Sequence, residues 1–92
     1  MFRFRPEVTP EQRQQARDAL ASNKDHCPTI SAYTVGLDLE RNPRNWDMVL
    51  VGDFADTAAL EAYFTHPHHN EISDQIDALT VADETARVQF EH

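Results

Sequence analysis

The chain has 92 residues, a length that predicts one domain over residues 1–92, because single domains typically run to about 100–200 residues. Its 16 acidic and 8 basic residues give a formal charge of −8, which disfavours nucleic acid and anionic membrane surfaces as partners. One cysteine excludes an internal disulfide, and the absence of a long apolar run predicts a soluble, cytoplasmic protein.

The first half of the chain predicts a strand, a helix and a second strand. Residues 2–5 alternate phenylalanine with arginine, the period of a half-buried strand. Thr9-Pro10-Glu11-Gln12 predicts a capped helix start, and the helix should run to about Ala21. Apolar side chains alternate again from Ile30 to Leu39, which predicts a strand with Tyr33 on the same face as its aliphatic neighbours.

The second half predicts a strand, a helix interrupted at a proline and a last strand. Trp46–Phe54 is the strongest strand pattern, and it is apolar on both faces at its middle. Asp56 should cap the next helix, which Pro67 must end or kink. Helical spacing resumes through Leu79, and residues 85–91 alternate as a final strand.

The resulting order is β-α-β-β-α-β, the signature of an α+β, ferredoxin-like fold with a four-stranded antiparallel sheet. Both helices should cover one face of that sheet. Val49 and Val51 lie on the other face of the central strand, where the chain offers no helix to cover them. The sequence therefore predicts a homodimer in which a second copy packs against this sheet face.

One local cluster carries residues that could do chemistry. Tyr63, His66 and His69 recur every three positions, so they could line one side of a pocket or its entrance. The alternatives are that His66 is a turn residue before Pro67 and that Tyr63 is a core ring with a satisfied hydroxyl. His68 should point elsewhere, into solvent.

Other chemistry finds less support in the sequence. Histidines three or four apart could share a zinc ion, but no carboxylate follows at matching spacing inside the cluster, and we predict no metal and no cofactor. Cys27 is expected to be a buried small thiol, and Asp38-Leu39-Glu40-Arg41 a solvated turn. The sequence has no phosphate loop, serine nucleophile elbow or dinucleotide fingerprint, which sets aside phosphoryl transfer, serine hydrolysis and hydride transfer.

Three stretches carry a resemblance to a known family. Residues 2–9 are similar to its first strand and helix entry, and residues 32–36 to its second strand with a glycine. Phe54, Tyr63, His66-Pro67 and His69 match its aromatic-x₈-Tyr-x-x-His-Pro-x-His pattern. On these stretches, which span nearly the whole chain, the protein resembles the stress-responsive A/B-barrel (Dabb) domain family of dimeric α/β barrels.

The resemblance implies a ferredoxin-like fold, a homodimer and a cavity in each protomer between helices and sheet. One plant branch of the family consists of polyketide cyclases that use a histidine base and a tyrosine donor. Carried over, these residues are His69 and Tyr63. Where the cyclases place a further histidine on the third strand, this chain has Met48.

Two functions from different classes follow. The first is a binding or stress-related module whose pocket takes a small apolar or carbonyl-containing ligand, with the histidines ordering its entrance. The alternative is a cofactor-independent cyclase-like or isomerase-like enzyme, with His69 as general base and Tyr63 as hydrogen-bond donor to an enolate oxygen. A weaker third possibility is a heme- or oxygen-using relative from the same barrel superfamily.

Overall fold

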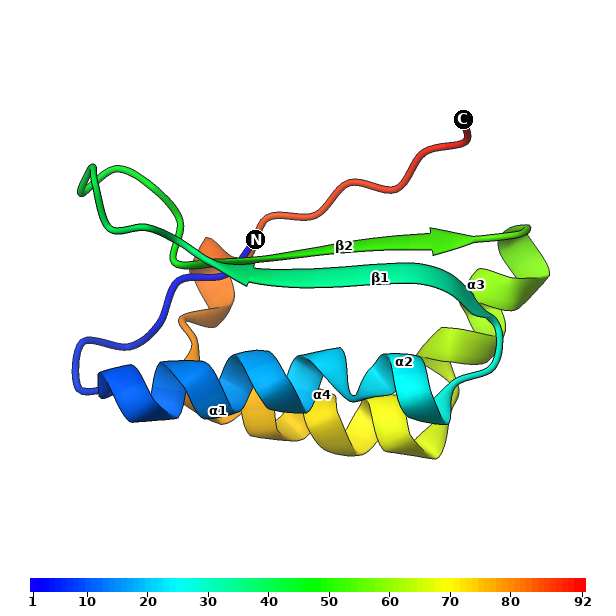
Figure 1. The fold of residues 1–92 in the computed structure, drawn as a ribbon, viewed down its shortest axis with the longest axis horizontal. Coiled ribbons are helices and arrows are strands. Elements are labelled where there is room, and N and C mark those ends of the chain that lie inside the picture. The colour runs from blue at the N-terminus through cyan, green and yellow to red at the C-terminus, as the bar shows by residue number, and fades with distance from the viewer.

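A computed structural model describes residues 1–92 as two layers, a β-hairpin and a set of helices that covers one of its faces. Figure 1 shows the helices on one side of the hairpin, whereas the C-terminal tail and the β1–β2 connection lie on the other. The elements follow in the order α1 (Pro10–Ala21), α2 (Asn23–His26), β1 (Ile30–Leu37), β2 (Met48–Phe54), α3 (Thr57–Phe64), α4 (Pro67–Leu79) and a short 3₁₀ helix, η1 (Ala82–Glu84).

The predicted helix starts are confirmed. The Thr9 hydroxyl accepts a hydrogen bond from the Gln12 N–H at 3.2 Å, and the Gln12 side chain accepts from the Thr9 N–H at 2.8 Å. Asp56 caps α3 by accepting from the Ala59 N–H at 2.8 Å. The short helix α2 follows the predicted end of α1 at Ala21, and the sequence pattern does not indicate it. None of the helices has the length and apolar character that a membrane crossing requires.

β1 and β2 form an antiparallel pair whose two faces differ in the way that the alternation predicts. Val35 lies opposite Leu50 on the face that packs against the helices, and Leu37 lies opposite Met48. Thr34 pairs with Val51 on the other face. Val49 and Val51 are 38% and 58% exposed there, so this open face of the sheet carries apolar side chains without a covering layer.

The two terminal strands of the predicted sheet are not formed as regular strands. The first is reduced to isolated bridges that join Phe2 to Met48 and Phe4 to Thr80. In the C-terminal tail, residues 85–92, the Thr85 N–H closes η1 by donating to the Ala82 carbonyl, and Ala86 is paired with Met1 through two backbone hydrogen bonds. A strand needs a neighbour to take up its N–H and C=O groups, and beyond this pair the tail has none.

The core consists of two clusters of buried side chains. The larger joins the N-terminal segment, α1, the sheet and α4 through eight residues, Phe4, Val8, Ala16, Leu20, Val35, Met48, Ile72 and Ile76. The smaller cluster lies toward α3 and contains Cys27, Ile30 and Tyr63. The expectation that Cys27 is a buried thiol is confirmed, and its sulfur lies 3.3 Å from the Thr29 hydroxyl.

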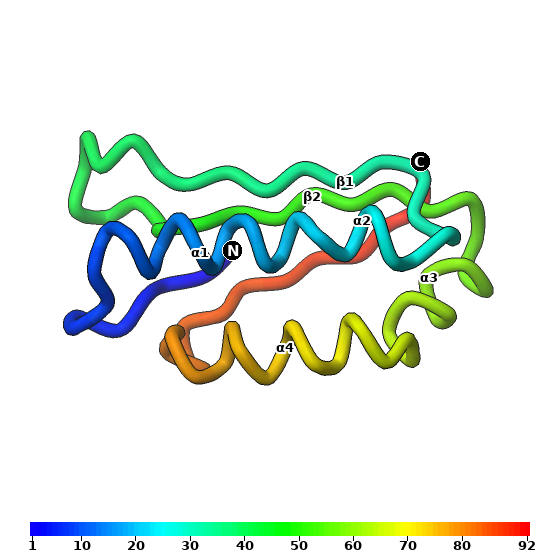
Figure 2. Tube along the Cα trace, turned by 60° about the horizontal axis from the view of Figure 1, so that its bottom comes forward, coloured from blue at the N-terminus to red at the C-terminus, as the bar shows by residue number.

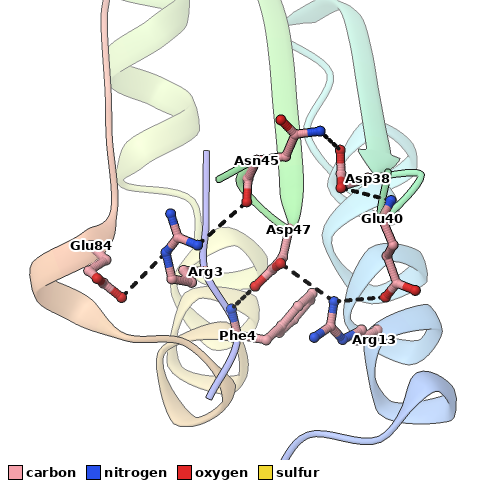
Figure 3. A network of polar contacts seen from close by, with 8 residues as sticks. All are labelled: Arg3, Phe4, Arg13, Asp38, Glu40, Asn45, Asp47 and Glu84. Carbon is pink, nitrogen blue, oxygen red and sulfur yellow. Dashed lines mark hydrogen bonds and ion pairs between the residues drawn. The ribbon is translucent and has the colours of Figure 1, made fainter. Parts of the chain in front are cut away.

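A polar network fastens the N-terminal segment to the β1–β2 connection and α1 (Figure 3). One carboxylate oxygen of Asp47 accepts from the Phe4 N–H at 2.8 Å, and the other lies 3.6 Å from the Arg13 guanidinium. Arg13 also contacts Glu40 at 3.4 Å. Part of the predicted solvated turn thus takes part in a tertiary contact, because Glu40 reaches the cation on α1.

Candidate functional site

The junction between α3 and α4 positions the aromatic and histidine side chains of the predicted cluster. Helix α3 ends at Phe64, and α4 begins at Pro67, which tolerates the first helical position because no hydrogen bond is required of its nitrogen there. His66 is the N-cap of α4, and its ring Nδ1 accepts a hydrogen bond from the His68 N–H at 3.1 Å. The ring of His66 therefore has a local structural role, in agreement with the alternative that His66 is a turn residue before Pro67.

Tyr63 and His69 do come together. Their ring centroids lie 4.3 Å apart with an interplanar angle of 58°. The two ring nitrogens of His69 lie near polar groups of α4, with Nε2 3.4 Å from the Ser73 hydroxyl and Nδ1 3.3 Å from the Asn70 side-chain oxygen. The half-buried His69 thus contacts an aromatic ring and has a polar group near each of its ring nitrogens.

The hydroxyl of Tyr63 is directed to a residue that the sequence did not single out as functional. It lies 2.8 Å from the hydroxyl of Tyr33, which comes from β1, and the Asn23 amide donates to the Tyr33 hydroxyl at 3.2 Å. These three residues, Asn23, Tyr33 and Tyr63, form what we call the inner polar cluster. Asn23 is only 1% exposed, and its side-chain oxygen has no hydrogen-bond partner.

Burial controls the protonation of the two tyrosines. Removal from water raises the pKa of Tyr63 far above its usual value, and the hydrogen bond with Tyr33 raises it further. Burial also raises the pKa of Tyr33, although its bonds with Tyr63 and Asn23 partly offset this effect. Both phenols therefore stay protonated at neutral pH. One hydroxyl donates its proton to the other in their hydrogen bond, and the accepting hydroxyl keeps its own proton for a further partner.

The prediction that His68 points into solvent is wrong. Its ring stacks on that of His26 at a centroid distance of 3.8 Å and an interplanar angle of 19°, and its Nε2 lies 2.9 Å from the Ser22 hydroxyl. Loss of water contacts lowers the pKa of His68, and the neighbouring His26 lowers it further. The helical turn α2 brings His26 to α4, a contact that spacing within α4 could not indicate.

Two hollows lie at the opposite end of the molecule from this junction. The larger, of about 410 Å³, is lined by a mixture of apolar and polar residues that includes Met1, Leu37, Trp46 and Val49. The smaller, of about 230 Å³, is lined by the polar network around Arg13 and Asp47. Neither includes a residue of the inner polar cluster or the histidines, so the hollows do not coincide with the cavity expected between helices and sheet.

The histidine cluster does not gather metal ligands. No group of three or more histidine, cysteine or acidic side chains is arranged to hold a metal ion. The ring of His66 caps α4, whereas that of His69 contacts Tyr63. The alternative of a zinc ion shared by His66 and His69 therefore gains no support from this geometry.

The chain is similar to a known protein family and to several solved structures. Residues 1–90 match the model of the family described as "Stress responsive A/B Barrel Domain". A dimeric ferredoxin-like protein of unknown function from Thermobifida fusca YX is 30% identical, with a TM-score of 0.78, over 87% of this chain and 76% of that chain. No curated protein matches the sequence significantly.

Two further solved structures share the fold at lower identity. A dimeric protein of unknown function and ferredoxin-like fold from Bacteroides fragilis NCTC 9343 is 22% identical, with a TM-score of 0.71, over 88% of this chain and 82% of that chain. The Arabidopsis thaliana protein At3g17210 is 20% identical, with a TM-score of 0.73, over 86% of this chain and 79% of that chain. The predicted α+β, ferredoxin-like fold is thus confirmed, although only two regular strands are formed here.

Proposed function

The chain belongs to the stress responsive A/B barrel (Dabb) domain family, and from that membership we propose that it is a homodimer that binds a small apolar or carbonyl-containing molecule. The binding region is the inner polar cluster between helices and sheet, and the role is a stress-related one in the cytoplasm. His66 and His69 order the edge of this region, at the junction of α3 and α4.

The open face of the sheet supports the homodimer. Val49 and Val51 are exposed there, and a sheet whose second face carries apolar side chains is characteristic of an interaction surface. A second copy of the chain presents the same face, as a two-fold interface requires. The Thermobifida fusca relative, which is dimeric and has the same fold, supports the same assembly.

The single observation that carries ligand binding is the unpaired oxygen of Asn23. A buried acceptor without a partner costs about 1–3 kcal/mol, which a ligand that donates a hydrogen bond would recover. The neighbouring Tyr33 and Tyr63 hydroxyls are protonated, and the one that accepts in their mutual hydrogen bond can donate to a carbonyl oxygen. Cys27 and Ile30 supply apolar surroundings, so a small molecule with one donor, one carbonyl and an apolar body fits this chemistry.

An NMR titration with 4-hydroxyacetophenone tests this proposal, because this probe has one hydroxyl donor, one carbonyl and an aromatic ring. We expect saturable shifts of the Asn23 side-chain amide and of the Ile30 backbone. Tyr33→Phe should weaken binding about tenfold, in line with the loss of one hydrogen bond. Trp46→Phe, in the hollow at the other end, is the matched control and should leave the affinity unchanged. Shifts confined to the Trp46 hollow, or no shift at millimolar probe, would reject this binding region.

The contact between Tyr63 and His69 favours a second candidate, a cofactor-independent enzyme of the cyclase or isomerase type. His69 as neutral imidazole would remove a proton from the carbon next to a carbonyl, and Tyr63 would donate a hydrogen bond to the enolate oxygen. A positioned general base of this kind typically accelerates a reaction by about 10²–10⁴-fold. Ser73 and Asn70 would hold the imidazole in a fixed orientation.

Exchange of the methyl-ketone protons of 4-hydroxyacetophenone in D₂O, followed by NMR, separates the two candidates. An enzyme should exchange these protons faster than buffer, and His69→Ala should return the rate to that of buffer. His92→Ala removes a histidine far from this junction in the chain and should leave the rate unchanged. If the unaltered protein exchanges no faster than buffer, the enzyme candidate fails while ligand binding stands.

A further inference from the structure

The inner polar cluster is closed to solvent. Asn23 and Cys27 are 1% and 2% exposed, and Tyr63 and Ile30 beside them are buried as well. Neither of the two hollows described above includes any of these residues. A ligand can therefore meet the unpaired oxygen of Asn23 only after some part of the chain has moved.

Helix α2 is the element that can move with the least loss of packing. It is a single helical turn, and Figure 2 shows it as a continuation of α1 at the end of the molecule where α3 meets α4. No residue of α2 belongs to either core cluster, and elements of this kind open most readily. Asn23 is its first residue, so a movement of α2 carries the Asn23 amide away from the Tyr33 hydroxyl.

Two contacts with His68 join α2 to α4. The His68 ring stacks on that of His26, and its Nε2 lies 2.9 Å from the hydroxyl of Ser22, the residue between α1 and α2. The Ser22 hydroxyl donates its own proton to the Ala19 carbonyl, so its oxygen accepts from His68. The neutral His68 ring therefore carries its proton on Nε2, and a second proton would go to Nδ1 without breaking the bond to Ser22.

The ring stack is the contact that depends on pH. The two rings lie 3.8 Å apart at an angle of 19°, an arrangement that suits neutral imidazoles. A second proton on each ring would place two like charges at that separation, where they repel. The closed form therefore binds fewer protons than a form in which the rings are apart and solvated, so acid favours opening. The lowered pKa of His68 in the closed form agrees with this direction.

The charged groups around the stack leave this dependence in place. Besides the histidines, the charged residues nearest to it along the chain are Arg17, Asp18, Lys24, Asp25, Glu61 and Glu71. Of these, Glu71 acts on His68 and favours its protonated ring, whereas the neighbouring His66 opposes it. The Lys24 ammonium is held at the Ile30 carbonyl, at 3.0 Å. Between pH 5.5 and 7, histidine is the side chain that ordinarily changes its charge.

We propose that α2 is a pH-sensitive lid over the inner polar cluster, closed while the His26 and His68 rings are neutral and opened when both are protonated. This inference rests on the function proposed above and specifies how access to its binding region is regulated. Because only the open form binds, the apparent dissociation constant equals the intrinsic one divided by the open fraction. The ligand thus gains affinity as the pH falls, and its binding in turn favours protonation of the two rings.

The Cys27 thiol reports the position of the lid without any ligand. It is buried directly after α2, so the aromatic disulfide dithiodipyridine reaches it only when α2 opens. Dividing its rate of modification by that of the urea-unfolded chain at the same pH removes the pH dependence of the thiol itself. We expect this relative rate to be about fivefold higher at pH 5.5 than at pH 7, as for a histidine whose pKa is about one unit lower in the closed form.

Three variants and a urea series show whether the stack controls the opening. His26→Phe keeps an aromatic ring against His68 but takes no proton, so it should abolish the rise. His92→Phe makes the same replacement at an exposed histidine and is the matched control, which should keep it. Ser22→Ala removes the acceptor of His68 and should raise the relative rate at both pH values. Low concentrations of urea should leave the rate unchanged, because opening one helical turn exposes little surface.

Three results of these measurements would reject the lid. The first is an equal relative rate of Cys27 modification at the two pH values. The second is a rise at pH 5.5 that persists in His26→Phe. The third is a rate that climbs with low urea in step with global unfolding, because the thiol would then be exposed by loss of the whole fold.

Titration with 4-hydroxyacetophenone at the same two pH values separates the lid from the function on which it rests. We expect binding about fivefold tighter at pH 5.5 than at pH 7, and no such gain in His26→Phe. Modification of Cys27 that depends on pH, without binding of the probe at either pH, would reject the binding region and support the lid. Binding that is equally tight at both pH values, with Cys27 equally protected, would reject the lid and support the binding region.

Discussion

The hydroxyl groups of Tyr33 and Tyr63 lie 2.8 Å apart, although the two residues are separated by 30 positions and belong to β1 and α3. Each phenol buries an apolar ring and needs a partner for its hydroxyl, so the pair satisfies both residues at once. Through this bond and the amide of Asn23, three elements meet inside a largely apolar region. In the function proposed above, the same groups would recognise a ligand carbonyl.

A double-mutant cycle measures this bond. Tyr33→Phe and Tyr63→Phe should each lower the free energy of unfolding by about 1–3 kcal/mol, because each leaves a buried hydroxyl with one partner fewer. The double variant should lose less than the sum, by about 0.5–3 kcal/mol, as expected for residues in direct contact. Urea denaturation of the four proteins gives these values. Strict additivity would mean that the two hydroxyls do not interact.

The carboxylate of Asp47 is expected to hold the N-terminal segment in place. Asp47→Ala removes the acceptor of the Phe4 N–H and the partner of Arg13, so we expect a loss of about 1–3 kcal/mol of stability. Asp47→Asn keeps an acceptor oxygen and should lose less. Asp53→Ala, whose carboxylate contacts only the exposed tail, is the matched control. Equal stability of the Asp47→Ala and Asp53→Ala variants by thermal unfolding would contradict this role.

The histidine stack should make stability depend on pH. The folded state holds the pKa of His68 below its unfolded value of about 6.5, because it is removed from water and stacks on His26. Between the two pKa values the unfolded chain binds more protons, so this contribution is complete above pH 6.5 and is lost as the pH falls. Glu71, which favours the protonated ring, and His66, which opposes it, both act on His68 as well.

Denaturation curves measured from pH 7.5 to 5 test this dependence. The His68→Gln variant should show a shallower loss of stability than the unaltered protein across this range. His92→Gln changes an exposed histidine at the chain end and should keep the original slope. Identical slopes for the unaltered protein and His68→Gln would show that the stack does not control proton binding.

The capping box of α1 should contribute measurably to the free energy of unfolding. Thr9→Ala leaves the Gln12 N–H without its acceptor, and a loss of about 1 kcal/mol is typical for an N-cap. Thr57→Ala, at the first position of α3, removes no cap because Asp56 fills that role. Chemical denaturation should therefore distinguish the two variants, and an unchanged midpoint for Thr9→Ala would contradict the cap.

Local patterns predicted much of the fold because local interactions decide those parts. The cap at Thr9, the end of the helix before Pro67 and the two faces of β2 all follow from residues close in sequence. Alternation predicts a strand over residues 85–91, and the structure has no regular strand there. A period of two indicates which residues share a face but not whether a neighbouring strand exists. Val88 and Phe90 have the pattern of a strand and lack the partner.

The candidate site was predictable only in part for a similar reason. The spacing of Tyr63 and His69 placed the two rings together, and they are in contact. The alternation predicts that Tyr33 shares a face with its aliphatic neighbours, and the need of a buried hydroxyl for a partner is the signal that points to the inner polar cluster. The contact of His68 with His26 joins residues 42 positions apart through α2, a helix that the sequence pattern did not indicate.

The measurement that tests the central claim most directly is sedimentation equilibrium of the full chain at micromolar concentration, compared with Val51→Asp. In the proposed homodimer the open face packs against a second copy, so we expect a dimer that this charge on the open face converts to a folded monomer. Gln75→Asp, on the exposed side of α4, should remain dimeric. A full chain that is monomeric at micromolar concentration, or a Val51→Asp variant that dimerises as tightly as Gln75→Asp, would contradict the account.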